Sequence, residues 1–555
     1  MIESKLRERT AMGNQFPAAF NSVPARNVAG LHQQVHFDDD GIAELVAAIR
    51  TPLRILMEAE TGRIGVQAIE ADAPAPVGYQ LMGMLPALDP ERLGDADFCS
   101  AHQVRFPYIA GEMANGIATT RMVRTLAETG LMGFFGAAGL GEGAVEHALT
   151  ELTHALAARR NWGVNLIHAP YEPRLEDRTA RALIRHRVPA VSASAYLDLT
   201  PALVLCAAQG LRTDRTGRVF RPRRVLAKVS RPETAGRFMS PAPVTFLRDL
   251  VDGGDLSEEE ARLAARVPVA EDVTVEADSG GHTDNRALVV LFPAIRRLGD
   301  TLSRDHGYAT PVRVGAAGGL GTPAAVAAAF ALGAAYVLTG SINQAAVESG
   351  LAEEGRNLLA QADLTDVTMA PAADMFEMGV RLQVLRRGTM FAGRATQLHD
   401  LYTSHASLED IPPERRARLE REVFGAPLEE VWADTCRFWN DRNPAEIDRA
   451  RHDARHRMAL VFRWYLGRSS RWAIDGDASR RTDYQIWCGP AMGAFNRWAE
   501  NSFLADPANR GVVQIALNLL EGAAAVTRAH QARTLGVPLP RGALDFVPRR
   551  LISPA

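Results

Sequence analysis

The sequence has little that would indicate a structural metal, a disulfide framework or a membrane segment. Its four cysteines, Cys99, Cys206, Cys436 and Cys488, lie far apart with no CxxC pair, which argues against structural zinc and disulfides. No apolar run approaches the length of a membrane span, and residues 1–14 contain no apolar signal core. A formal net charge of −3 gives no global electrostatic reason to bind nucleic acid or membranes. We therefore expect a cytoplasmic protein without a metal site.

Length and composition allow a sizeable core. The chain has 555 residues, enough for two to four domains or for one barrel with large additions. Hydrophobic residues make up 47% and charged residues 23%, which is ordinary for a soluble globular protein. No low-complexity segment interrupts the chain, and the only repeat is a strand–helix unit. The fold class therefore has to come from the order of the elements.

The most informative stretch is residues 312–341, which reads as strand, glycine turn, helix, strand and a second glycine turn. Gly318 and Gly319 let the backbone turn tightly and approach a ligand without a Cβ in the way. Thr322 is a good N-cap and Pro323 suits the first helical position, so a helix is expected to begin there. Its N-terminus offers free N–H groups and a partial positive charge, which favour a phosphate.

A second small turn, Gly340-Ser341, follows the next strand. In a (β/α)8 barrel the loops after the seventh and eighth strands form the usual phosphate site. We interpret the paired turns as that site, although a glycine-rich helix start that binds nothing is the structural alternative.

Short apolar strands alternate with helices from Arg105 onward, at about one unit per thirty residues. This alternation predicts an α/β fold, a (β/α)8 TIM barrel. The expected strands are residues 108–111, 131–136, 163–167, 190–194, 225–229, 273–277, 312–315 and 336–339.

The remainder of the chain does not follow the barrel pattern. Residues 42–50 are expected to form a helix, and residues 54–58 and 77–82 to form strands. A long, apolar-striped helix is expected over 509–535. The expected parts are a small α+β region over 1–100, the barrel over 101–395, a helical region over 396–505, and a C-terminal part over 506–555 whose helix packs on the barrel.

Active sites of such barrels lie at the carboxyl ends of the strands. Residues 111–115, after the first strand, are small enough to approach a flat ring. Asn165 ends the third strand, where its amide can hydrogen-bond a heterocycle, and Lys228 on the fifth can place a charge against a ring or phosphate. His282 follows the sixth strand and a glycine pair, so it can donate a proton or orient a substrate. For Asn165 and Lys228, capping or ion pairing is an equally common role.

Other polar residues are interpreted as structural. No GxSxG turn is present, so Ser192 and Ser194 are expected to cap backbone groups rather than act as nucleophiles. His452 and His456 are four residues apart, but HDARH lacks the glutamate of HExxH, and we expect a surface helix face. The basic run over 221–224 is interpreted as a solvated loop.

The chain resembles the PfaD family along most of its length, from about Leu81 onward. These are the trans-acting enoyl reductases of polyunsaturated fatty acid and trans-acyltransferase polyketide synthases, related to nitronate monooxygenases and FabK-type enoyl reductases. The segment 374–395 and the helical C-terminal part are more specific to PfaD than the barrel motifs. The motifs that carry the resemblance are YIAGEMANGI, LMGFFGAAGL, WGVNLIHAP, VLAKVSRPE, EADSGGHTDNR, VGAAGGLGTPAAVAAAFALGAAYVLTGS and MFEMGVRLQVLRRGTMFAGRA.

The resemblance implies bound FMN, with NAD(P)H as a transient co-substrate. His282 matches the active-site histidine of the wider superfamily. By match of motif, the residues that would hold the FMN phosphate are Gly318, Gly319, Gly340 and Ser341. Those that would border the isoalloxazine and ribityl chain are Met113, Ala114, Asn165 and Lys228.

The implied reaction reduces an α,β-unsaturated thioester carried by an acyl carrier protein. NAD(P)H reduces FMN, hydride passes to the β-carbon, and a proton reaches the α-carbon. The helical region over 400–500 is expected to receive the carrier, which is typically acidic. Arg386-Arg387 or residues 414–421 are candidate contacts, though each also reads as an ordinary exposed segment. A homodimer is one assembly that the family allows.

Two rival hypotheses remain. A nitronate monooxygenase would use FMN and oxygen without NAD(P)H, but the helical addition is superfluous for so small a substrate. A barrel scaffold that has lost its cofactor would not need intact glycine turns.

Overall fold

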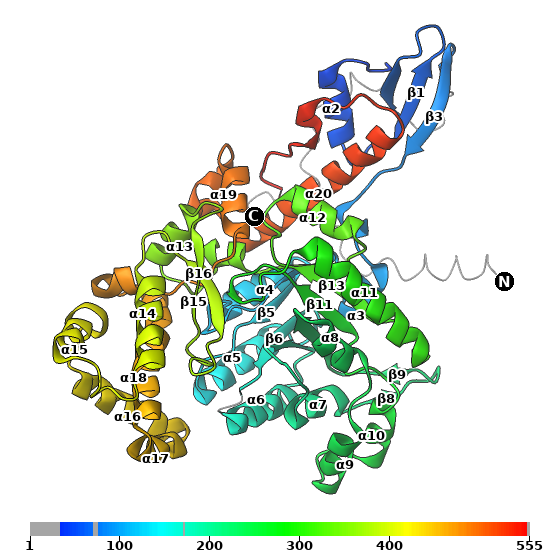
Figure 1. Ribbon diagram of the computed structural model, residues 1–555. Coiled ribbons are helices and arrows are strands. Elements are labelled where there is room, and N and C mark those ends of the chain that lie inside the picture. The colour runs from blue at the N-terminus through cyan, green and yellow to red at the C-terminus, as the bar shows by residue number, and fades with distance from the viewer. Residues whose placement is uncertain (1–33, 70–75, 170–171, 552–555) are drawn as a thin grey trace. The chain divides into compact units, whose positions relative to one another are not determined.

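The computed structural model describes residues 34–69, 76–169 and 172–551 (Figure 1). The chain divides into two compact units, one made of residues 1–88 and 525–555 and the other of residues 89–524. This division places the last residues with the N-terminal ones, and the boundaries of the four expected parts stay predictions. Residues 1–33 of the expected N-terminal region lie outside the described residues. Within those residues no helix is both long and apolar enough to cross a membrane.

The smaller unit is built around a three-stranded antiparallel sheet with the order β2-β1-β3. Alternating apolar residues bury one face of this sheet against the helices, with Ile42, Ile55, Val66 and Ala529 fully buried. The sequence predicted the helix and two of the strands but missed β2. The elements are α2 (Asp39–Ala47), β1 (Leu53–Glu58), β2 (Ile64–Ala68), β3 (Tyr79–Leu85), the second half of α20 (Val512–Thr534) and the 3₁₀ turn Arg541–Leu544.

The larger unit contains a closed barrel of eight parallel strands, which confirms the predicted TIM barrel. Neighbouring strands follow the order of the sequence, and the last strand pairs with the first, Val337 lying opposite Tyr108. The strands are β4 (Tyr108–Ala110), β5 (Met132–Phe135), β6 (Trp162–Ile167), β7 (Ala190–Ser194), β10 (Arg224–Val229), β11 (Asp272–Glu276), β13 (Arg313–Ala317) and β14 (Val337–Thr339).

Helices surround the barrel (Figure 1). Several begin at the residues expected from capping: Thr322 precedes Pro323, and its Oγ1 accepts a hydrogen bond from the Ala325 amide. These helices are α3 (Ala96–His102), α4 (Thr120–Glu128), α5 (Glu142–Ala155), α6 (Pro173–Arg185), α7 (Pro201–Ala208), α8 (Pro232–Met239), α9 (Val244–Asp252), α10 (Glu258–Ala264), α11 (Leu288–Asp305), α12 (Pro323–Ala331) and α13 (Glu353–Ala360); a short hairpin joins β8 (Arg212–Thr213) to β9 (Val219–Phe220).

A second sheet and a helical region follow the barrel. The sheet has the antiparallel order β12-β16-β15, with β12 (Gly281–His282), β15 (Val367–Pro371) and β16 (Arg381–Leu385). Phe376, Phe391 and Tyr465 lie in the buried core that this region shares with the sheet. The helices are α14 (Phe391–Ser404), α15 (Pro413–Leu419), a π-turn (Glu420–Phe424), α16 (Leu428–Arg442), α17 (Pro444–His452), α18 (Ala454–Asp475) and α19 (Ala491–Ala499).

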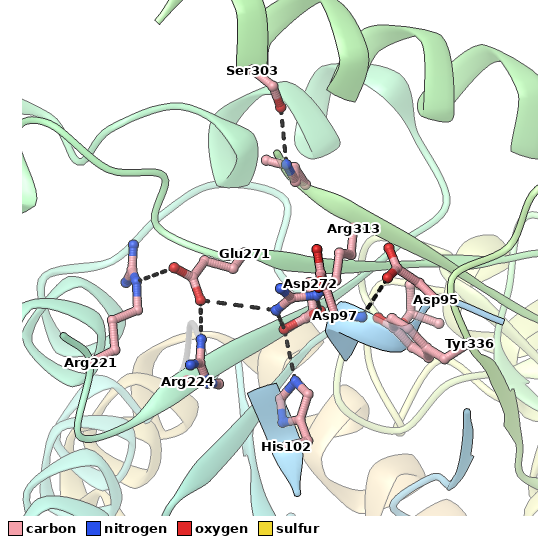
Figure 2. Close-up of polar contacts among 12 residues, drawn as sticks. Asp95, Asp97, His102, Arg221, Arg224, Glu271, Asp272, Ser303, Arg313 and Tyr336 are labelled. Atoms are coloured by element: carbon pink, nitrogen blue, oxygen red, sulfur yellow. Dashed lines mark hydrogen bonds and ion pairs between the residues drawn. The ribbon is translucent and has the colours of Figure 1, made fainter. Parts of the chain in front are cut away.

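Charged side chains close the N-terminal end of the barrel (Figure 2). Asp272 and Arg313, the first residues of β11 and β13, form a two-pronged ion pair with distances of 2.6 and 2.8 Å. His102 Nε2 lies 2.9 Å from the other side of the same carboxylate. Burial lowers the pKa of His102 and outweighs the opposing effect of Asp272. Because this cluster lies at the start of the strands, it supports the barrel and is not a site for chemistry.

Two sequence-based interpretations are wrong. The basic run over 221–224 is not solvated: Arg221 is buried and pairs with Glu271, which also pairs with Arg224. His456 does not lie on a surface face, since it is buried with Nε2 2.8 Å from Glu446. In both cases the acidic partner lies elsewhere in the sequence, so the local pattern gave no sign of burial.

Candidate functional site

Every residue predicted for the site lies on a barrel strand or directly after its carboxyl end. The closed barrel turns eight separate stretches into one ring, so these residues gather at the barrel mouth. Met113 and Ala114 follow β4, Asn165 lies in β6, Lys228 lies in β10, His282 follows β11, Gly318 and Gly319 follow β13, and Gly340 and Ser341 follow β14.

Lys228 is held between two carboxylates. Its Nζ lies 3.2 Å from Glu112 Oε1 and 3.1 Å from Glu276 Oε1. Burial alone would lower the pKa of Lys228, but the two carboxylates outweigh it and raise the pKa above its ordinary value. Ser194 donates to the same Glu112 oxygen at 2.5 Å. The ammonium group is therefore charged and fixed at the mouth.

Asn165 fixes the loop after β5. Its Oδ1 accepts hydrogen bonds from the amides of Ala137 at 2.8 Å and Ala138 at 3.2 Å. Among the described residues its Nδ2 donates to no partner, so this nitrogen is available to a ligand. Met113, on the neighbouring loop, is buried.

His282 pairs with Asp374, which lies between β15 and β16. His282 Nε2 is 3.2 Å from Asp374 Oδ1. Burial opposes the charged form of the imidazole, but the Asp374 carboxylate outweighs it and raises the pKa of His282. Nδ1 has no hydrogen-bond partner among the described residues and faces away from that bond. The pair can hold a proton and release it to a ligand.

The two glycine turns leave room for a ligand. Gly318 and Gly319 have φ values of +88° and +73°, a conformation that favours glycine. A Cβ built on Gly319 or Gly340 would meet no atom within 4 Å. The N-terminus of α12 begins just past the first turn and Ser341 supplies a hydroxyl in the second. These features fit the phosphate of a mononucleotide.

Sequence reasoning missed three acidic residues of the site. Glu112 lies inside the YIAGEMANGI motif and Glu276 ends β11, so their place at strand ends was the available signal. Asp374 could not be linked to His282 before the second sheet was known. Ser192 Oγ is buried without a partner among the described residues. In that same part of the chain, no group of three acidic, histidine or cysteine side chains could hold a metal ion.

The helical region matches a family of known proteins. Residues 405–484 match the family described as the inserted helical domain of [acyl-carrier-protein] S-malonyltransferase. They include α15, α16, α17 and α18.

Two curated relatives share most of the chain. It is 45% identical over 443 residues to the polyketide biosynthesis protein ThaF of Burkholderia thailandensis, covering 80% of this chain and 38% of that protein. It is 44% identical over 449 residues to one component of the polyunsaturated fatty acid synthase of Thraustochytrium sp., covering 80% and 30%. The chain thus spans less than half the length of these relatives.

A solved structure matches over nearly its whole length. The enoyl reductase domain of MlnA, from the macrolactin biosynthesis cluster of Bacillus amyloliquefaciens, is 34% identical with a TM-score of 0.75. The match covers 80% of this chain and 98% of that domain.

Proposed function

Since the chain belongs to the PfaD-like family of enoyl reductases, we propose that it reduces α,β-unsaturated thioesters on an acyl carrier protein with FMN and NAD(P)H. The observation that carries the proposal is the barrel mouth, where two open glycine turns share one ring with a buried lysine and a histidine–aspartate pair. The setting is polyketide or polyunsaturated fatty acid synthesis, as in the names of the relatives.

The residues present fit FMN. Gly318, Gly319, Gly340 and Ser341 would hold its phosphate beside the N-terminus of α12. Met113, Ala114, Asn165 and Lys228 would border its ring and ribityl chain, with Asn165 Nδ2 free to donate. Bound FMN would supply hydride transfer from NAD(P)H to the β-carbon of the substrate. No separate dinucleotide fingerprint is present in the sequence, so NAD(P)H would visit the same mouth transiently.

His282 and Asp374 supply the proton. With Nε2 turned to Asp374, the protonated imidazole keeps its Nδ1–H for the α-carbon. Asp374 orients the ring and stabilises its charged form. His282 is the catalytic residue in this proposal, and Asp374 is a positioning residue.

The test is turnover of a defined substrate. The purified protein is mixed with NADPH and a crotonyl thioester on a carrier protein, and the acyl group is then weighed by mass spectrometry. The proposal requires a saturated acyl group and stoichiometric NADPH loss. Oxygen-dependent turnover of a nitronate, with no reduction of the thioester, would replace the proposal with a nitronate monooxygenase.

A further inference from the structure

A short segment from the far end of the larger unit crosses the two glycine turns. We define residues 487–491, which lead from the helical region into α19, as the C-terminal strap. The Gly489 amide donates to Ser341 Oγ at 3.0 Å, and Gln344 donates from Nε2 to the carbonyl of Trp487. A Cβ on Gly321 would come within 2.1 Å of the Ala491 carbonyl oxygen. The strap therefore contacts the turn after β13 and the turn after β14.

The strap is held by backbone contacts that exclude side chains. A Cβ on Gly489 would come 2.9 Å from the Gly280 amide nitrogen. A Cβ on Gly280 would come 2.8 Å from the Cys488 nitrogen and 2.9 Å from Ser341 Oγ. Such approaches are closer than real Cβ atoms make, so both positions require glycine. The Cys488 amide also donates to the carbonyl of Gln383 in β16, at 3.2 Å.

The bond to Gly489 determines what Ser341 can do. A hydroxyl has one proton to donate, and here its oxygen already accepts from the Gly489 amide. Among the described residues the Ser341 hydroxyl donates to no acceptor, so its proton remains for a ligand. Space beside the adjacent Gly340 is open. Without the strap, Ser341 would rotate freely and water would compete for its oxygen.

We propose that the C-terminal strap is part of the cofactor phosphate site: the Gly489 amide orients Ser341 as a hydrogen-bond donor to the phosphate and holds the two turns together. This inference rests on the proposed function, because it takes the phosphate of FMN as the ligand. Gly489 is a positioning residue, since it acts through Ser341. The strap begins just after residues 405–484, so the phosphate site and the helical region are joined through one short stretch of chain.

The test compares FMN with riboflavin, which lacks the phosphate. Flavin-free protein is titrated with each, following flavin fluorescence. Unaltered protein is expected to bind FMN at least tenfold more tightly. Gly489→Ala and Ser341→Ala should each weaken FMN at least tenfold and riboflavin less than twofold, the double variant being no worse than either. Ser341→Thr should recover most of the loss, and Gly467→Ala, in open space on α18, should change nothing.

Hydrogen exchange of residues 487–491 in the unaltered protein covers the case that Gly489→Ala fails to fold. FMN should slow exchange there and riboflavin should not. Equal effects of the two ligands, or none, in both experiments would overturn the role of the strap. Failure of the unaltered protein to bind FMN, or to prefer it over riboflavin, would instead refute the proposed cofactor and with it the proposed function.

Discussion

His282 and Asp374 form an imidazole–carboxylate pair with 3.2 Å between Nε2 and Oδ1, although one follows a barrel strand and the other lies beyond the barrel. A two-residue strand, β12, brings them together because it pairs with β16, His282 lying opposite Leu382. The extra sheet thus positions the proposed proton donor at the mouth.

Replacing Asp374 should move the pH dependence of enoyl reduction. The raised pKa of His282 means that the folded enzyme keeps this proton to higher pH than an isolated histidine would, and activity is lost as pH rises through that value. Asp374→Asn removes the main raising influence, so the loss should begin at lower pH in a profile of kcat/KM. His282→Ala should lower turnover about 10²- to 10⁴-fold while FMN stays bound.

The control for that profile is Asp300→Asn, which alters an exposed ion pair on α11. Its profile should coincide with that of the unaltered enzyme. If Asp374→Asn also leaves the profile in place, Asp374 does not govern the protonation of His282.

Lys228→Met should destabilise the fold. It leaves the carboxylates of Glu112, with a side chain 4% exposed, and Glu276 without their shared cation. Breaking a buried ion pair in this way costs about 3–5 kcal/mol in the free energy of unfolding. Adding Glu112→Gln to Lys228→Met should recover part of the loss in urea unfolding. Equal stability of the single and double variants would show that the carboxylates do not interact with Lys228.

Arg313→Met tests the cluster at the opposite end of the barrel. Asp272 is fully buried and would lose its two-pronged partner, so the free energy of unfolding should fall by about 3–5 kcal/mol. Arg313→Lys should fall between, because lysine keeps the charge but not the fork. Below the unfolding transition, kcat should be unchanged in each variant. A specific loss of kcat without loss of stability would contradict a purely structural role.

Reversing charges on the helical region should weaken use of carrier-bound substrate. Arg415 and Arg421 are exposed on α15 and the π-turn that follows. With an acidic carrier, Arg415→Glu combined with Arg421→Glu should raise KM about three- to tenfold and leave kcat unchanged. KM for a free pantetheine thioester should not change. Arg296→Glu on α11 is the matched control, and an equal rise in that variant would argue against docking at this segment.

The barrel could be predicted because its signal is local. Each strand is a short apolar run between a helix and a turn, and glycines mark the turns after β13 and β14. His282 could be singled out because Gly280 and Gly281 precede it at a strand end. The Asn165 and Lys228 positions followed from the same rule.

What could not be predicted depends on contacts between distant segments. Lys228 meets Glu112 and Glu276 only after three strands take their places in one barrel. Arg221 seemed a solvated residue because its partner, Glu271, lies fifty residues away. The strap over 487–491 carries no local mark of its contact with Ser341. Sequence patterns therefore locate the mouth, whereas the fold determines its charges.

The most direct test of the central claim is an anaerobic flavin titration. The spectrum of the purified protein is recorded, NADPH is added, and a crotonyl thioester on a carrier protein follows. The account predicts that flavin absorbance bleaches with NADPH and returns with the thioester. Flavin that stays oxidised with NADPH, in a protein that turns over a nitronate with oxygen, would contradict it, as would a protein that neither contains nor takes up flavin.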